Sequence, residues 1–183
     1  MRILGIDPGS VLLGYGAIES RGNSLQLIEY GVVKAKLIEE EYYKRLNEIY
    51  HHVGKIIDRV KPDVMSFETM FYHKNAQSLI KLAQARAAAI LAAVERKLEI
   101  IEYTPREVKK SVSGKGTASK QQVQYMIRTI LKIEEKPEFF DATDALAIAL
   151  CHYYKQGKTG STNNKVKSWS DFIDRNPERV FKV

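Results

Sequence analysis

Cysteine and long apolar runs are scarce in this chain of 183 residues, and each absence excludes a class of protein. The single cysteine, Cys151, excludes an internal disulfide and favours a reducing compartment. It lies in the apolar run ALAIALCHYY, which indicates a core residue rather than a nucleophile. No run of about 18 apolar residues occurs, so no membrane span is expected. No basic stretch followed by an apolar one opens the chain, so no signal peptide is expected and the expected location is the cytoplasm.

Negative charge is scarce in two segments of a chain whose net charge is +7. Residues 104–133 contain seven basic residues and one acidic residue, and residues 155–183 contain seven basic and three acidic residues. The remainder of the chain therefore has a net charge of −3. A basic segment and a basic tail on a mildly acidic body favour a polyanionic partner, most simply nucleic acid. Lysines solvated on helix faces would give the same composition.

The length favours one domain, over residues 1–154, followed by a basic tail over 155–183 that begins with a linker-like stretch, 155–170. The apolar patterns predict strands over 2–7, 13–20, 24–35, 63–68 and 98–103. They predict helices over 42–60, 76–97, 105–114, 119–133 and 141–154. Short turns join the first three strands, which predicts an antiparallel meander. Strands and helices then alternate, which predicts a mixed α/β sheet with helices on its faces.

Carboxylates end two of the predicted strands and begin the last helix. Asp7 ends the strand in RILGIDPGS, where Asp-Pro-Gly by itself favours a turn. Glu68 ends the strand DVMSFE in the same way. Asp141 and Asp144 are three residues apart, so they share one helix face with about 4.5 Å of axial rise between them. Taken singly, Asp141 could cap the helix and Asp144 could interact with its dipole.

These four acids can share one edge of an α/β sheet, because strand ends and a helix start can meet there. Four carboxylates placed together would repel and raise one another's pKa unless a cation compensates. His51 and His52 are adjacent on a helix and point in different directions, so they do not form an obvious ligand pair. The four carboxylates offer oxygen ligands, which suit Mg²⁺ or Mn²⁺. Two such ions about 3.5–4 Å apart are a recurrent device for phosphodiester cleavage. The sequence therefore predicts a two-ion Mg²⁺ site at which Mn²⁺ can substitute.

Residues that could bind nucleic acid lie close to these acids. Phe71 and Tyr72 follow Glu68 in a short loop, where an exposed aromatic could wedge between base pairs or stack on an opened base. Packing beneath the loop is an equally good interpretation of both aromatics. The basic segment is expected to hold the rest of the polyanion through Lys109, Lys110, Lys115 and Lys120.

Four stretches also carry a family resemblance. They are GIDPGS, SFE followed by MFYHKNAQSLIKLAQARAAA, EYTPREVKKSVSGKGTASKQQVQYMI, and DATDALAIALCH. Together they resemble the RuvC Holliday-junction resolvases over roughly residues 1–154. The stretch KPEFFDATD is slightly longer than usual before Asp141, which leaves the acids themselves in place.

The resemblance implies a ribonuclease-H-like fold, with a mixed five-stranded sheet and helices on both faces. It implies a homodimer that makes Mg²⁺-dependent, symmetric nicks in two opposed strands of a four-way DNA junction. The products would carry ligatable 5′-phosphates, and the enzyme would act with the RuvA–RuvB branch-migration machinery. The family's acids, its inserting aromatic and its important basic residues fall on Asp7, Glu68, Asp141, Asp144, Phe71, Lys109 and Lys120.

A two-fold dimer would present two matching sites to a four-way junction. The Ala-rich helix predicted over 76–97 is a candidate for the contact between subunits. Packing inside one subunit explains its small residues equally well; they include Ala83, Ala87, Ala88, Ala92 and Ala93.

Three other functions use parts of the same pattern. An actin-like ATPase also begins with a strand, an Asp and a Gly-containing turn, but it needs two duplicated lobes and would bind nucleotide. Another ribonuclease-H-like nuclease acting on RNA would share the fold and differ in substrate. A non-catalytic nucleic-acid-binding module would bind unchanged after Asp7→Asn. Only a resolvase accounts for both the fourfold acid arrangement and the long motif match.

Overall fold

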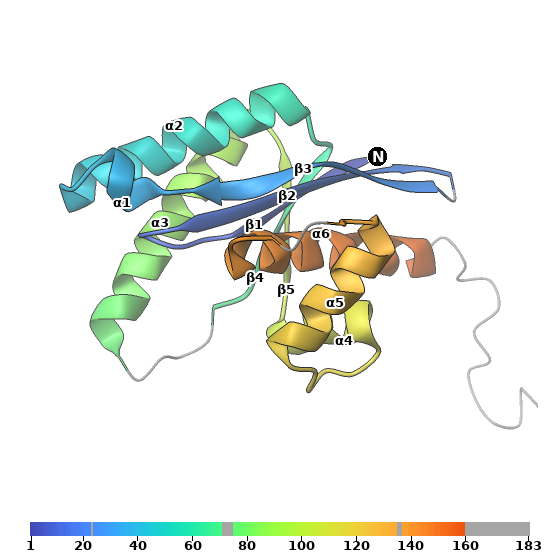
Figure 1. Cartoon of the computed structure of the whole chain (residues 1–183). Helices are drawn as coiled ribbons and strands as arrows, with labels where there is room; N and C mark the ends of the chain where they lie inside the picture. Colours follow the sequence, from blue (N-terminus) through green and yellow to red (C-terminus); the bar gives the residue numbers. More distant parts are fainter. Residues whose placement is uncertain (23, 71–74, 135–136, 160–183) are drawn as a thin grey trace, which may run out of the picture.

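A mixed five-stranded sheet forms the centre of the protein (Figure 1). The computed structural model describes residues 1–22, 24–70, 75–134 and 137–159. The strand order is β3-β2-β1-β4-β5, with β1 to β3 antiparallel and β4 and β5 parallel to β1. The strands are β1 (Arg2–Asp7), β2 (Leu13–Arg21), β3 (Ser24–Val33), β4 (Val64–Glu68) and β5 (Glu99–Tyr103). The meander and the mixed sheet expected from the sequence are confirmed.

Helices cover both faces of the sheet, as expected (Figure 1). On one face, α2 and α3 bury aliphatic side chains against Phe67, and on the other α4, α5 and α6 pack around Leu146. The sheet therefore separates two hydrophobic cores. The helices are α1 (Ala35–Ile38), α2 (Tyr42–Val60), α3 (Ala76–Glu95), α4 (Pro105–Ser113), α5 (Lys120–Leu131) and α6 (Phe140–Thr159).

Glycines let α6 lie directly on the sheet. A Cβ added at Gly5 would lie 2.0 Å from the carbonyl oxygen of Ala145, and one added at Gly14 would lie 2.0 Å from that of Asp141. Real Cβ atoms do not approach backbone this closely, so any side chain at either glycine would push α6 away. The two glycines thereby fix the start of α6 against β1 and β2.

Side-chain caps and a glycine mark the ends of two helices. The Asn75 side chain accepts a hydrogen bond from the Ser78 N–H at the start of α3. Thr104 and Glu107 form a reciprocal capping box at the start of α4, and Gly114 ends that helix with a φ of +77°. Cys151 is buried, as expected of a core residue. Within the described ranges, no helix combines the length and apolar character that a membrane crossing requires.

Most predicted boundaries differ from the observed ones by no more than two residues, and two of the differences change an interpretation. Ala35, expected to end β3, begins the short helix α1 instead. The last helix, expected to end at 154, continues through Thr159, so the linker interpretation is wrong for residues 155–159. The extra turn gains contacts because Lys155 forms an ion pair with Glu107 and lies 5.4 Å from the centre of the Tyr103 ring. Residues 160–183 lie outside the described ranges.

Candidate active site

The first two acids lie side by side at one edge of the sheet. Strands β1 and β4 are parallel neighbours, and Ile6 is in register with Phe67. The residues that follow, Asp7 and Glu68, therefore end adjacent strands. This placement is the shared edge that the sequence predicts.

Helix α6 brings the other two acids to the same edge. Gly14 pairs with Asp7 across the β1–β2 ladder and also lies against the backbone of Asp141. Asp144 follows one turn later and lines the same pocket as Asp7 and Glu68. Asp141 does not line this pocket, but its negative charge contributes to the raised pKa of Asp7.

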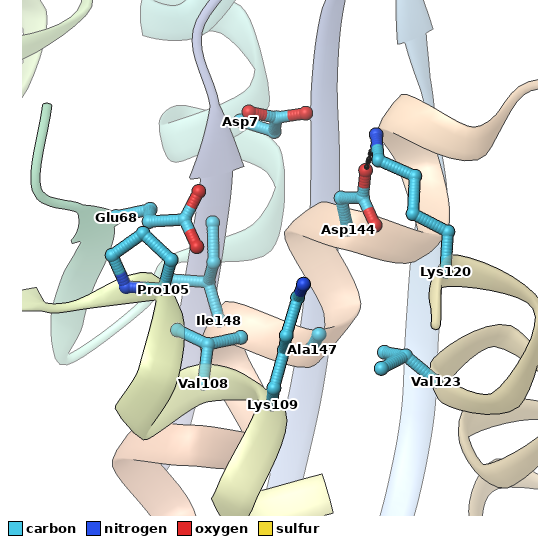
Figure 2. Close-up of a pocket in the computed structure, with 10 residues that line it drawn as sticks. All are labelled: Asp7, Glu68, Pro105, Val108, Lys109, Lys120, Val123, Asp144, Ala147 and Ile148. Atoms are coloured by element: carbon cyan, nitrogen blue, oxygen red, sulfur yellow. Dashed lines mark hydrogen bonds and ion pairs between the residues drawn. The ribbon is translucent and has the colours of Figure 1, made fainter. Parts of the chain in front are cut away.

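A pocket of about 250 Å³ opens between these acids and the basic helices α4 and α5. Figure 2 shows carboxylates and lysine ammonium groups directed toward one space, above a floor of apolar side chains. The lining residues are Asp7, Glu68, Pro105, Val108, Lys109, Lys120, Val123, Asp144, Ala147 and Ile148.

Burial and mutual repulsion perturb these carboxyl groups. Burial, followed by the charges of Asp144, Asp141 and Glu68, raises the pKa of Asp7 from 3.8 to about 8. Burial and the charge of Asp144 also raise the pKa of Glu68. Carboxyls perturbed in this way are characteristic of functional sites, because a stable fold gains nothing from crowding acids together.

Two lysines partly compensate this negative charge. Lys120 Nζ lies 3.1 Å from Asp144 Oδ2, and the charge of Asp144 raises the pKa of Lys120 (Figure 2). The charges of Lys109 and Lys120 both act to lower the pKa of Glu68, against the effect of burial. The pocket therefore combines acids with cations that could contact phosphate oxygens.

The remaining predicted site residues lie elsewhere. Lys110 lines a separate groove with Tyr154 and Lys155, and Lys115 lines another with Tyr125. Phe71 and Tyr72 lie outside the described residues. The structure thus brings two of the four predicted lysines to the acids.

The donor set matches a hard divalent cation in chemistry. Asp7 and Glu68 are carboxylates whose raised pKa values reflect burial and like charge, which a bound cation would relieve. Among the described side chains, no three potential ligands are already arranged to share one ion. A third acid of the pocket, Asp144, is engaged in an ion pair with Lys120. Ligation would therefore require rotation of side chains within the pocket.

Sequence reasoning missed two residues that support the site. Gly14 is one, and its signal was the GYG spacing that follows Asp7 in the chain. Arg86 is the other: it is buried in α3 and donates a hydrogen bond to the carbonyl oxygen of Glu68. Its signal was a single cation inside the apolar run ARAAAILAA.

The fold and the site define a ribonuclease-H-like nuclease: a five-stranded mixed sheet with acids at the ends of β1 and β4 and on α6. Residues 3–152 match the family model described as crossover junction endodeoxyribonuclease RuvC. The chain belongs to the RuvC family of crossover junction endodeoxyribonucleases.

Individual relatives agree with this assignment. The crossover junction endodeoxyribonuclease RuvC of Chloroherpeton thalassium is 41% identical over 100% of both chains. That of Cytophaga hutchinsonii is 40% identical over 99% of this chain and 88% of its own. Thermus thermophilus RuvC, solved in complex with a Holliday junction substrate, has a TM-score of 0.74 at 29% identity, covering 86% of this chain and 96% of that one.

Proposed function

We propose that this nuclease resolves four-way DNA junctions by nicking two opposed strands symmetrically, leaving 5′-phosphate ends that can be ligated. The observation that carries the proposal is the pocket in which Asp7, Glu68 and Asp144 face Lys109 and Lys120. The similar Thermus thermophilus protein was solved with a Holliday junction substrate, which supports the choice of DNA over RNA. Such a reaction serves homologous recombination and DNA repair.

Mg²⁺ is the proposed cofactor, with two ions in each site and Mn²⁺ as a substitute. Asp7, Glu68, Asp141 and Asp144 would hold it. When bound, the metal supplies an activated water and neutralises charge at the scissile phosphate. The high pKa of Asp7, about 8, supports this assignment, because at neutral pH the cluster needs a cation to ionise fully.

The chain's own residues bind and orient the substrate. Lys109 and Lys120 lie on the α4–α5 side of the pocket, where their ammonium groups would contact phosphate oxygens flanking the cut. Val108, Val123 and Ile148 give the pocket an apolar floor next to the acids. Phe71 and Tyr72 would follow the last residue of β4 into the junction, and Lys110 and Lys115 would contact DNA farther from the cut.

A homodimer is the proposed assembly, with α3 as its contact. The structure divides the small residues of this helix into a buried set, which includes Ala88, Ala92 and Ala93, and an exposed set. The exposed set, Ala83 and Ala87, forms a row at helical spacing with three apolar side chains that are more than half exposed, Ile80, Leu91 and Val94. A second copy of this chain is the occupant favoured here, because two opposed cuts require two sites related by a two-fold axis.

The family resemblance also leads us to propose cooperation with a RuvA–RuvB branch-migration complex in the cytoplasm. A co-sedimentation assay with that complex on a four-way junction tests this partnership. Binding of the two to separate junctions only would contradict it.

A cleavage assay with three substrates tests the proposed function. The protein with Mg²⁺ should make paired, symmetric nicks in a mobile four-way junction and leave linear duplex and an RNA–DNA hybrid intact. Asp7→Asn should bind the junction without cutting it. Cutting of the hybrid alone would instead favour an RNA-directed nuclease with the same fold.

A further inference from the structure

A buried arginine lies behind the acidic pocket, on the opposite side of the sheet. Arg86 belongs to α3, is 7% exposed, and is not among the residues that line the pocket. Its neighbours on the buried face of α3 include Ala85, Ala89 and Ala93. Removing a guanidinium from water costs free energy unless its N–H groups are hydrogen-bonded and its charge is paired. The position therefore requires specific partners.

Arg86 has three such partners at the ends of β4 and β5. Its Nη1 donates to the carbonyl oxygen of Glu68 at 3.1 Å, and its Nη2 lies 2.5 Å from Glu102 Oε1. The guanidinium carbon lies 5.2 Å from the centre of the Phe67 ring. Glu102 and Phe67 thus hold the guanidinium in the orientation in which it reaches Glu68.

The contact to Glu68 fixes one particular peptide group. The N–H of Thr69 donates to the carbonyl oxygen of Tyr103 at 2.8 Å, which extends the β4–β5 ladder beyond Glu68. The carbonyl of the same peptide group accepts from Arg86. Both polar groups of the Glu68–Thr69 peptide are therefore held, one by β5 and one by α3. This restrains the backbone from which the Glu68 side chain enters the pocket.

We propose that Arg86 is a positioning residue for Glu68 and thereby sets the rate of strand cutting. Without Arg86, the carbonyl oxygen of Glu68 loses its hydrogen-bond donor where β4 ends. The backbone that positions the Glu68 carboxylate in the pocket is then less restrained. The proposal rests on the proposed role of Glu68 in that pocket. It extends the site to a residue on the other face of the sheet, outside the lining of the pocket.

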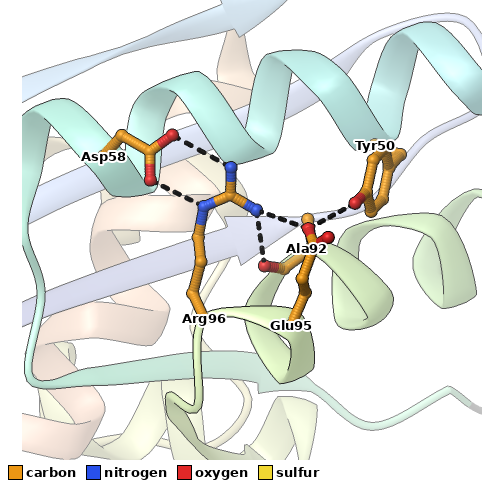
Figure 3. A network of polar contacts seen from close by, with 5 residues as sticks. All are labelled: Tyr50, Asp58, Ala92, Glu95 and Arg96. Carbon is orange, nitrogen blue, oxygen red and sulfur yellow. Dashed lines mark hydrogen bonds and ion pairs between the residues drawn. The ribbon is translucent and has the colours of Figure 1, made fainter.

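A purely structural role, in which Arg86 only attaches α3 to the sheet, makes a different prediction. Arg96, at the end of the same helix, provides the matched comparison (Figure 3). It bonds Asp58 on α2 at 2.7 and 2.9 Å and also contacts Glu95 and the carbonyl of Ala92. This network attaches α3 to α2 through residues that do not line the pocket.

The test compares Arg86→Gln and Arg86→Lys with Arg96→Gln, using Glu68→Gln as the reference for a lost carboxylate. Three quantities are measured on a four-way junction: the single-turnover cutting rate at saturating protein, the Mg²⁺ concentration for half-maximal rate, and the Kd in EDTA. Arg86→Gln should cut about 10- to 100-fold more slowly, as expected of a small misplacement in a catalytic site. It should also need more Mg²⁺ and keep the wild-type Kd.

The comparison variants separate positioning from folding. Arg96→Gln should lose thermal stability yet keep the wild-type rate and Mg²⁺ requirement. Arg86→Lys keeps the charge beside Glu102 but lacks the planar fork that reaches two acceptors, so its rate should be intermediate. It also decides the question if Arg86→Gln does not fold.

A wild-type rate and Mg²⁺ requirement in folded Arg86→Gln or Arg86→Lys, with Glu68→Gln inactive, would overturn the positioning role alone. Equal rate losses in Arg86→Gln and Arg96→Gln would also overturn it. Normal cutting by Glu68→Gln would reject the proposed role of Glu68 together with the inference built on it.

Discussion

Lys120 Nζ and Asp144 Oδ2 lie 3.1 Å apart, in an ion pair that joins α5 to α6 at the pocket. The same ammonium group acts to lower the pKa of Asp7, against burial and three surrounding acids that raise it. One lysine therefore compensates part of a negative cluster that remains unbalanced. This imbalance is the physical reason for assigning a divalent cation to the site.

Wild-type stability in EDTA should fall relative to that of Asp7→Asn as the pH rises from about 4 to 8. The folded-state pKa of Asp7, about 8, lies above its ordinary value of 3.8. The folded protein therefore binds a proton that the unfolded chain releases, and the stabilisation present below pH 3.8 is lost as the pH passes 8. A tenfold difference between the proton affinities of the folded and unfolded states corresponds to about 1.4 kcal/mol.

Urea unfolding of both proteins across this range measures the effect, because the difference between them removes the contribution of titrating groups that do not interact with Asp7. Asp7→Asn should be the more stable at pH 8 by at least about 1.4 kcal/mol, the free energy of a tenfold difference in proton affinity. A difference between the two proteins that does not change with pH would contradict the repulsion described for Asp7.

Lys109→Ala and Lys110→Ala should differ although the two lysines are adjacent in α4. Lys109 lines the acidic pocket and Lys110 lines a separate groove. Both changes should reduce the slope of log K against log salt by about 0.9, as expected for one lost phosphate contact. Only Lys109→Ala should also slow cutting at saturating protein. Equal cutting rates in the two variants would show that Lys109 has no role in cutting beyond that of Lys110.

Gly14→Ala should weaken both stability and cutting. The added Cβ would lie 2.0 Å from the carbonyl oxygen of Asp141, so the start of α6 must move away from Asp7. Overpacking of this kind costs about 1–3 kcal/mol. Thermal unfolding and junction cleavage measure the two effects. Gly22→Asn is the control, because its site has open space and a φ of +58°, which Asn tolerates.

Leu91→Glu should convert the protein to monomers and abolish paired nicking. Leu91 is 59% exposed in the apolar row on α3, where a charge would oppose contact with a second copy. Leu37→Glu, at an 81% exposed position on α1, is the matched control. Sedimentation velocity measures both variants beside wild type. Identical sedimentation of Leu91→Glu and wild type would exclude α3 as the contact.

The sequence predicted the strand ends that carry Asp7 and Glu68 because local signals determine them: a short apolar run, an acid, and a turn or break. It also predicted that Asp144 would lie near them, because the start of a helix can meet strand ends at one edge of an α/β sheet. The Arg86 contact could not be predicted in this way. It depends on α3 crossing the ends of β4 and β5, and no local pattern encodes that crossing.

Contacts between distant segments also explain why α6 extends to Thr159. The sequence after 154 is polar and favours a linker, whereas Lys155 gains an ion pair with Glu107 and a place over the Tyr103 ring. Tertiary contacts outweighed local propensity there. The division of the alanines of α3 into buried and exposed sets likewise required knowing which face of the helix meets the sheet.

A metal-rescue measurement tests whether the acids form a metal centre for phosphodiester cleavage. One non-bridging oxygen of the scissile phosphate in a four-way junction is replaced by sulfur, and cutting rates are compared in Mg²⁺ and Mn²⁺. Sulfur should slow cutting in Mg²⁺, which prefers oxygen ligands, and Mn²⁺ should restore it. Equal slowing in both metals, or equal rates with sulfur and oxygen in Mg²⁺ for both sulfur stereoisomers, would contradict a metal held at Asp7, Glu68, Asp141 and Asp144.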